Sequence, residues 1–110
     1  GLGPVEYIPK GYKGAEWDTM KYANGSTYTG SWADGQRSGS GTVNYANGDK
    51  FSGSFAADLR DGSGTYTWAN GTTYRGTWKA GQARKGGTYS YTDAGVKEGL
   101  SAGGNLTMQD

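Results

Sequence analysis

Aromatic residues and glycines alternate with hydroxyl-bearing residues in two kinds of short segment that recur along this chain. The first kind reads aromatic–x–Gly–x–aromatic, and the second carries glycine and then apolar or aromatic residues at every second position. The pairs of segments stand at 28–32 and 39–45, at 51–55 and 62–68, and at 74–78 and 85–91. Side chains two residues apart share one face of a strand, so each segment predicts a strand with one aromatic and glycine face and one Ser/Thr face. No segment has the apolar spacing of a helix, and we expect little or no helix.

The strands are joined by a turn that recurs every 23 residues, with the sequence aromatic–Ala–Asn–Gly. Asn-Gly between alternating segments is a strong hairpin signal, because a type I′ turn needs φ > 0 at both central residues. The predicted turn residues are Asn24, Gly25, Asn47, Gly48, Asn70 and Gly71. The turn at the other end of each hairpin is predicted to be looser, and Asp58 replaces a glycine there, so we expect the middle turn to differ.

The offset of 23 residues divides the chain into repeats of one domain spanning residues 1–110. Full repeats are expected at 22–44, 45–67 and 68–91, a cap and partial repeat at 1–21, and a degenerate repeat and cap at 92–110. Residues 5–8 are a candidate first strand, residues 93–95 resemble the repeated turn, and Leu106 and Met108 are candidates to close the sheet. The expected fold is all-β: a single elongated, twisted antiparallel sheet of consecutive β-hairpins.

The apolar content of the chain limits the core that it can form. Fifteen residues are aromatic, whereas Leu, Ile, Val and Met together number ten. Because each buried ring removes about 150–250 Å² from water, a thin sheet with one face covered by rings is feasible where a thick aliphatic core is not.

Charge and residue types exclude several classes of function. The net charge is +1 with both signs interspersed, and the longest basic run is Arg84-Lys85, so nucleic-acid binding is not expected. No stretch approaches the roughly 20 apolar residues of a transmembrane helix. The chain has no Cys and no His, which removes thiol chemistry and the commonest general base and metal ligand.

Catalysis and metal binding therefore depend on carboxylates alone. Asp58 and Asp61 share a loop, but Asp in turns far more often bonds its own backbone. Leu59 and Arg60 stand between them, where a calcium loop needs more oxygen ligands. We expect no catalytic residue, no metal, no cofactor and no enzymatic activity.

The order of turn, aromatic strand and glycine strand resembles the membrane occupation and recognition nexus (MORN) repeat over about residues 17–99. Asp58, Lys85 and the degenerate fourth copy depart from that pattern. The resemblance implies a meander of hairpins with a groove lined by the aromatic positions. The candidate groove residues are Tyr28, Trp32, Phe51, Phe55, Tyr74 and Trp78. The competing interpretation is that these rings are simply the core of a thin sheet, because burial is the usual state of large apolar groups.

Three kinds of ligand remain open. The family resemblance favours a scaffold that contacts a protein partner, or a second copy of the chain, through the aromatic groove or an edge of the sheet. An extracellular surface or fibre domain that binds glycan is the alternative, since aromatic residues beside Asn, Asp and Gln suit sugar stacking. Acidic phospholipid is a further alternative suggested by the resemblance, although the clusters of about four to eight Lys/Arg typical of such binding are missing. The resemblance favours a cytoplasmic or peripheral membrane location and the composition an extracellular one, so the compartment stays open.

Overall fold

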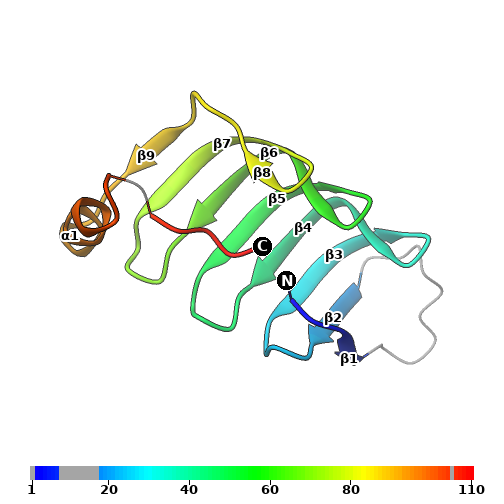
Figure 1. Cartoon of the computed structure of the whole chain (residues 1–110). Helices are drawn as coiled ribbons and strands as arrows, with labels where there is room; N and C mark the ends of the chain where they lie inside the picture. The colour runs from blue at the N-terminus through cyan, green and yellow to red at the C-terminus, as the bar shows by residue number, and fades with distance from the viewer. Residues whose placement is uncertain (1, 8–17, 105) are drawn as a thin grey trace.

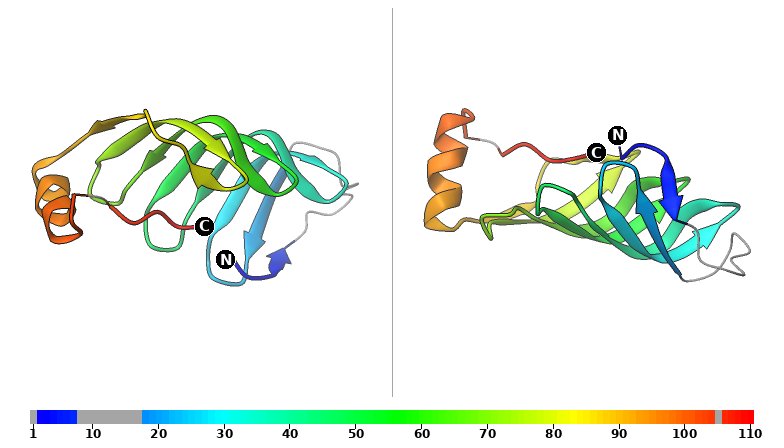
Figure 2. Two further views of the ribbon diagram at one scale, coloured as in Figure 1. Left: turned by 45° about the horizontal axis from the view of Figure 1, so that its top comes forward. Right: turned by 90° about the horizontal axis from the view of Figure 1, so that it is seen from below.

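The computed structural model describes residues 2–7, 18–104 and 106–110, in which nine strands form one antiparallel sheet that is followed by a helix. Neighbours in sequence are neighbours in the sheet, except that β8 and β9 both pair with β7 (Figure 1). The elements are β1 (Val5–Tyr7), β2 (Asp18–Tyr22), β3 (Thr27–Ala33), β4 (Gln36–Asn44), β5 (Lys50–Ala56), β6 (Leu59–Thr67), β7 (Thr73–Lys79), β8 (Gln82–Ala83), β9 (Thr88–Ser90) and α1 (Asp93–Ser101). The molecule measures 46 × 25 × 17 Å, and Figure 2 shows the twist of the sheet along its length. The expected elongated, twisted meander of hairpins is confirmed.

A row of glycines crosses the middle of the sheet and makes room for the aromatic rings. Paired from strand to strand, the row consists of Gly30, Gly41, Gly53, Gly64 and Gly76. The ring of Phe51 lies against this row, so that a Cβ atom on Gly64 would lie 2.5 Å from Cζ of Phe51. Tyr28 and Tyr74 lie in the same way against the row in the repeats on either side. The glycines on this face therefore leave the space into which the neighbouring rings pack.

The aromatic face of the sheet is the core of the protein. Its buried members are Leu2, Met20, Tyr22, Tyr28, Trp32, Val43, Tyr45, Phe51, Phe55, Tyr66, Trp68, Tyr74, Trp78 and Leu106. Many rings meet edge to face, as Phe51 and Trp78 do with centroids 4.8 Å apart, which is a favourable geometry for two quadrupoles. The alternation of ring and hydroxyl along each strand therefore separates a dry face from a solvated one.

The Asn-Gly turns do not have the predicted type I′ conformation. Gly48 has φ of 94°, but Asn47 is not among the described residues with positive φ. Gly48 donates its N–H to the carbonyl of Tyr45 at 3.0 Å, and the Oδ1 atom of Asn47 accepts the N–H of Asp49 at 3.0 Å. Asn is needed here because its short side chain bonds the backbone two residues on, and Gly because the next position is left-handed. The other two Asn-Gly turns repeat this arrangement.

The type I′ signature lies instead at the opposite ends of the hairpins, where a looser turn was predicted. Both central residues have positive φ in Asp34-Gly35, in Ala57-Asp58 and in Ala80-Gly81. These are tight two-residue turns, whose twist matches that of the flanking strands. Asp58 was expected to change the middle turn, and that expectation is wrong, because Asp58 has φ of 71° where the equivalent Gly35 has 76°. Asp tolerates the left-handed region better than most residues.

The two ends of the chain differ in how well the sequence predicted them. Strand β1 pairs with β2, as expected for residues 5–7, and residue 8 lies outside the described residues. The turn predicted at residues 93–95 is wrong, because helix α1 occupies Asp93–Ser101. Thr92 caps this helix by accepting the N–H of Gly95 at 3.1 Å. Leu106 and Met108 form no strand and instead lie on the aromatic face.

Candidate interaction surfaces

Successive repeats are joined at the Asn-Gly ends by one equivalent buried side chain in each. Ser26 accepts the backbone N–H of Ala46 at 3.1 Å, and Asp49 accepts that of Ala69 at 2.8 Å. These acceptors stand directly after the turn glycine and are almost fully buried. In the third repeat Thr72 takes this place and receives the N–H of Thr92 at 3.2 Å, which fixes the start of α1.

Asp49 also anchors the core from its second carboxylate oxygen. The Tyr66 hydroxyl donates to Oδ2 of Asp49 at 2.6 Å. Burial raises the pKa of Tyr66 above its usual value, and the hydrogen bond to Asp49 raises it further. Burial likewise raises the pKa of Tyr45, against the lowering effect of the nearby Arg60 guanidinium. Both phenols are therefore held in their neutral form.

Two buried arginines join the repeats at the tight-turn ends. Arg37 and Arg60 occupy equivalent positions 23 residues apart and are 8% and 7% exposed. Each backbone carbonyl accepts an N–H from the tight turn of the next repeat, from Asp58 at 3.0 Å and from Gly81 at 2.8 Å. Each guanidinium also donates to the carbonyl of that same turn residue. The guanidinium groups lie over aromatic rings of the core, with Arg37 5.1 Å from the centroid of Phe55.

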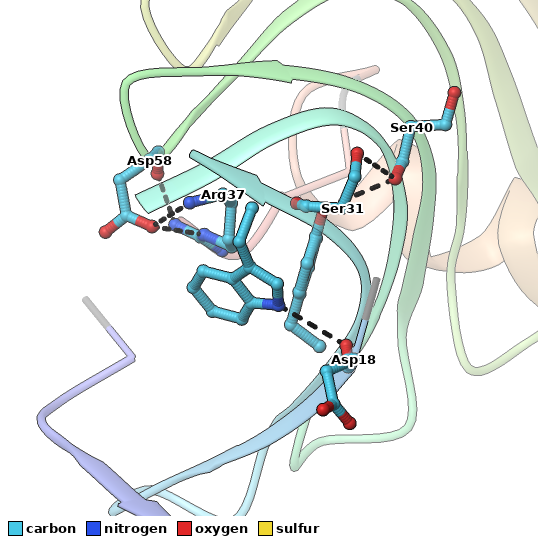
Figure 3. Close-up of polar contacts among 7 residues, drawn as sticks. Asp18, Ser31, Arg37, Ser40 and Asp58 are labelled. Carbon is cyan, nitrogen blue, oxygen red and sulfur yellow. Dashed lines mark hydrogen bonds and ion pairs between the residues drawn. The ribbon is translucent and has the colours of Figure 1, made fainter. Parts of the chain in front are cut away.

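The two arginines differ in one contact. Arg37 Nε donates to Oδ1 of Asp58 at 2.8 Å, and Figure 3 shows the two side chains pointing toward one another. Arg60 meets a glycine, Gly81, at the equivalent turn position, and its Nε is buried without a hydrogen-bond partner among the described residues. Both arginines line a hollow of about 580 Å³ at this end of the sheet.

The end of the chain lies across the aromatic face. Residues 106–110 run from the α1 end back along the sheet, as the red trace in Figures 1 and 2 shows. The indole N–H of Trp68 donates to the carbonyl of Thr107 at 2.8 Å, and the N–H of Gln109 donates to the Tyr66 hydroxyl at 2.8 Å. Leu106 is 9% exposed in the core and Met108 packs against it. This face thus holds an extended segment by two hydrogen bonds and two apolar side chains.

The six rings predicted to line a groove are all buried, and none is more than 5% exposed. They are Tyr28, Trp32, Phe51, Phe55, Tyr74 and Trp78. The structure brings them together in contacts such as Tyr28 with Phe55, whose centroids are 5.1 Å apart. They pack as the core of the sheet, as the competing interpretation proposed. A binding role for them stays a prediction.

The opposite face carries hydroxyl groups in rows across the strands. Thr29 pairs with Thr42, and Thr42 pairs with Ser52, whose hydroxyl lies 3.2 Å from that of Thr42. This face is hollowed between β4 and β7, over a volume of about 630 Å³ lined by Ser, Thr and Gly together with Arg75. The hollow along the middle strands is therefore lined by hydroxyl groups and not by aromatic rings.

A third surface lies at the α1 end of the sheet. Helix α1 buries its two interior glycines, Gly95 and Gly99, and turns its larger apolar side chains outward. Val96 is 47% and Leu100 76% exposed. With Tyr91, which is 43% exposed, they surround a small hollow of about 170 Å³. The helix thus presents an apolar patch to solvent, defined here as the terminal patch of Tyr91, Val96 and Leu100.

The residues that join the repeats were not predicted from the sequence. Ser26, Asp49 and Thr72 follow the turn glycine at the 23-residue offset, and Arg37 and Arg60 share that offset too. Their recurrence at this offset was the sequence signal that could have identified them. It was hidden because the three acceptors are chemically different and because the third equivalent of the arginines is Ala83.

The comparisons with known proteins agree with this geometry. The MORN repeat profile matches residues 28–50, 51–73 and 74–84, which is more than half of the chain. The chain belongs to the MORN repeat family. No curated protein matches the chain. MORN repeats generally form binding or scaffold modules for protein or membrane-lipid contacts, and the family is generally non-catalytic.

The structure adds one observation on membranes. Among the described residues of this MORN repeat protein, no helix is long and apolar enough to cross a membrane. The absence of a metal, a cofactor and a catalytic residue stays a prediction.

Proposed function

We propose that this MORN repeat domain is a non-catalytic scaffold that contacts a second copy of itself through the open end of its sheet. The observation that carries the proposal is the terminal patch, in which the helix buries glycines and exposes Val96 and Leu100. Contiguous exposed apolar side chains mark interaction sites in soluble domains.

The neighbouring strand favours an identical partner. β9 pairs with β7 on one side, and the described residues place no strand on its other side. Thr88–Ser90 carries neither charge nor proline, the two usual means by which an edge strand resists pairing. Helix α1 carries Lys97 beside Glu98, so that an identical helix presents both signs of charge and is not repelled. A two-fold contact between such ends is self-complementary.

The oligomeric state of the full chain tests this function. We expect sedimentation equilibrium to give a mass above that of the 11.5 kDa monomer, in a concentration-dependent way. The double variant Val96→Glu/Leu100→Glu should be monomeric, because buried unpaired carboxylates oppose the contact. Leu59→Glu is the matched control, since Leu59 is 46% exposed, as Val96 is 47%, but lies at the start of β6 and not in α1. A wild-type chain that stays monomeric at every concentration contradicts the proposal.

Glycan binding is a second candidate, favoured by the hydroxyl-lined hollow between β4 and β7. Rows of Ser and Thr hydroxyls beside Arg75 supply donors and acceptors for a polyhydroxylated ligand. The stacking rings first considered for this function are buried. A glycan array probed with the wild type and with Thr65→Val separates this candidate from self-association. The described residues give no observation that favours acidic phospholipid.

A further inference from the structure

Arg37 and Arg60 occupy equivalent positions in successive repeats, and their surroundings differ by one carboxylate group. Residues 58 and 81 are equivalent, and each accepts a guanidinium hydrogen bond on its backbone carbonyl. Asp58 adds a carboxylate to Nε of Arg37. Gly81 has no side chain to offer Arg60, so the place of that carboxylate beside Arg60 is not filled by the turn.

Arg60 is a buried cation with an incomplete set of partners. It is 7% exposed and donates to the Tyr45 hydroxyl at 3.2 Å and to the Gly81 carbonyl at 2.8 Å. The rings of Phe51 and Tyr66 lie 5.6 and 5.8 Å from its guanidinium carbon and stabilise the charge in part. Within the described part of the chain, its Nε has no acceptor. A buried charge normally has both a counter-charge and full hydrogen bonding, so an anionic acceptor on Nε would complete the partners of Arg60.

The hollow beside Arg60 is reached along the path of the chain's own end. Residues 106–110 cross the aromatic face as an extended segment, with Leu106 and Met108 on the rings. Asp110 lines the same hollow as Arg37 and Arg60. An extended segment that follows this path therefore carries an acidic residue to the edge of the arginine hollow.

We propose that Arg60 anchors a carboxylate-binding site for an extended peptide that follows the path of residues 106–110 and places an Asp or Glu side chain on Arg60, as Asp58 lies on Arg37. The peptide's apolar residues pack on the aromatic face, and its carboxylate accepts from Arg60 Nε. The chain's own end occupies this path and competes with such a peptide. This site is separate from the terminal patch, so the outcome of the self-association experiment bears on neither its presence nor its ligand.

The probes are two acetylated, amidated peptides, Leu-Thr-Met-Gln-Asp and Leu-Thr-Met-Gln-Asn, which differ by one carboxylate. Each is titrated into the ¹⁵N-labelled full chain, and the Nε–H resonances of Arg60 and Arg37 are followed by NMR. We expect a saturable shift at Arg60 with the Asp peptide, about tenfold weaker binding of the Asn peptide, and little change at Arg37. The variant Asp110→Asn should bind the Asp peptide more tightly, because its own end competes less.

Gly81→Asp supplies the missing carboxylate within the chain and is the decisive variant. Gly81 has φ of 84°, close to the 71° of Asp58, and a Cβ there would lie 3.6 Å from Leu59, an ordinary contact. We expect Gly81→Asp to lose the preference for the Asp peptide, while Gly81→Asn, with the same backbone demand and no charge, keeps it. Thermal melting verifies that both variants fold. Equal binding of the two peptides to the wild type, an unchanged preference in Gly81→Asp, or no saturable shift in either the wild type or Asp110→Asn overturns the proposal.

Discussion

The hydroxyl of Tyr66 donates to Oδ2 of Asp49 at 2.6 Å, across 17 residues of sequence, and the same carboxylate accepts the N–H of Ala69 through Oδ1 at 2.8 Å. One side chain from the Asn-Gly turn thus satisfies one buried donor of its own repeat and one of the next. Ser26 and Thr72 hold the same place in the neighbouring repeats with a single hydroxyl each. The middle junction therefore depends on a longer and charged acceptor.

Replacing Asp49 with alanine should destabilise the fold by about 1–3 kcal/mol, because the hydroxyl of Tyr66 and the N–H of Ala69 lose their acceptor. Asp49→Ser is the matched control and should recover part of the loss, since Ser26 accepts the equivalent N–H in the first repeat. Urea denaturation measures both free energies of unfolding. An Asp49→Ala protein as stable as the wild type would show that this junction contributes nothing.

Stability should fall as the pH rises above about 10, the ordinary pKa of tyrosine. Burial raises the pKa of Tyr66 in the folded protein, with a further increase from its bond to Asp49, and burial also raises that of Tyr45. Above pH 10 the unfolded chain loses protons that the folded chain keeps, so the free energy of unfolding decreases with pH. The slope should approach about 1.4 kcal/mol per pH unit for each such group.

Urea titrations between pH 8 and pH 11 measure this slope. Tyr66→Phe should make it shallower, since the variant has one group fewer to deprotonate on unfolding. A slope that Tyr66→Phe leaves unchanged would assign the alkaline transition to other groups.

Gly53 should not accept a side chain. A Cβ atom there would lie 2.5 Å from the carbonyl oxygen of Ser63 and 2.6 Å from Cα of Gly64, and backbone atoms cannot move aside as a flexible side chain does. We expect Gly53→Ala to cost about 1–3 kcal/mol through overpacking, and Gly53→Val more. Gly35→Asn is the control, because no atom of the described residues lies within 4 Å of a Cβ position on Gly35, and Asn tolerates positive φ. A melting temperature for Gly53→Ala equal to that of the wild type would contradict the face assignment.

The sequence was sufficient to predict the sheet, since alternation with period 2 fixes which side chains share a face. Helix α1 was not predicted because its pattern of apolar residues is inverted. Gly95 and Gly99 face the protein, whereas Val96 and Leu100 face solvent. A search for an apolar stripe facing a core could not find it. The N-cap Thr92 and the acidic Asp93 in the first turn were the local signals that it did carry.

The turn types and the arginines were missed for a different reason. Asn-Gly occurs most often in two-residue type I′ turns, which is why such a turn was predicted at Asn47. The loop at Asn47 is longer than two residues, and Asn47 stabilises it by accepting the N–H of Asp49 on its side-chain oxygen. The bond between Arg37 and Asp58 joins residues 21 apart in different repeats, and neither is part of the aromatic pattern. At the 23-residue offset, Arg60 is equivalent to Arg37, and Gly81 is equivalent to Asp58. This comparison alone indicates that Arg60 lacks the carboxylate that Arg37 has.

The six buried rings should influence stability before they influence any contact with a partner. Trp78 is 2% exposed and packs edge to face on Phe51 and Tyr74, so Trp78→Ala should cost about 3–5 kcal/mol. Leu100→Ala is the complementary variant, because Leu100 is 76% exposed and its truncation should leave the free energy of unfolding nearly unchanged.

Urea denaturation and sedimentation on the same samples separate the two roles, provided that sedimentation is done well below the melting temperature of Trp78→Ala. We expect Trp78→Ala to lose stability and keep its association constant, and Leu100→Ala to show the reverse. A Trp78→Ala protein that keeps its stability but no longer associates would support the binding role that the sequence predicted for this ring. It would also show that the ring becomes accessible to a partner, since a side chain that is 2% exposed makes no contact outside its own fold.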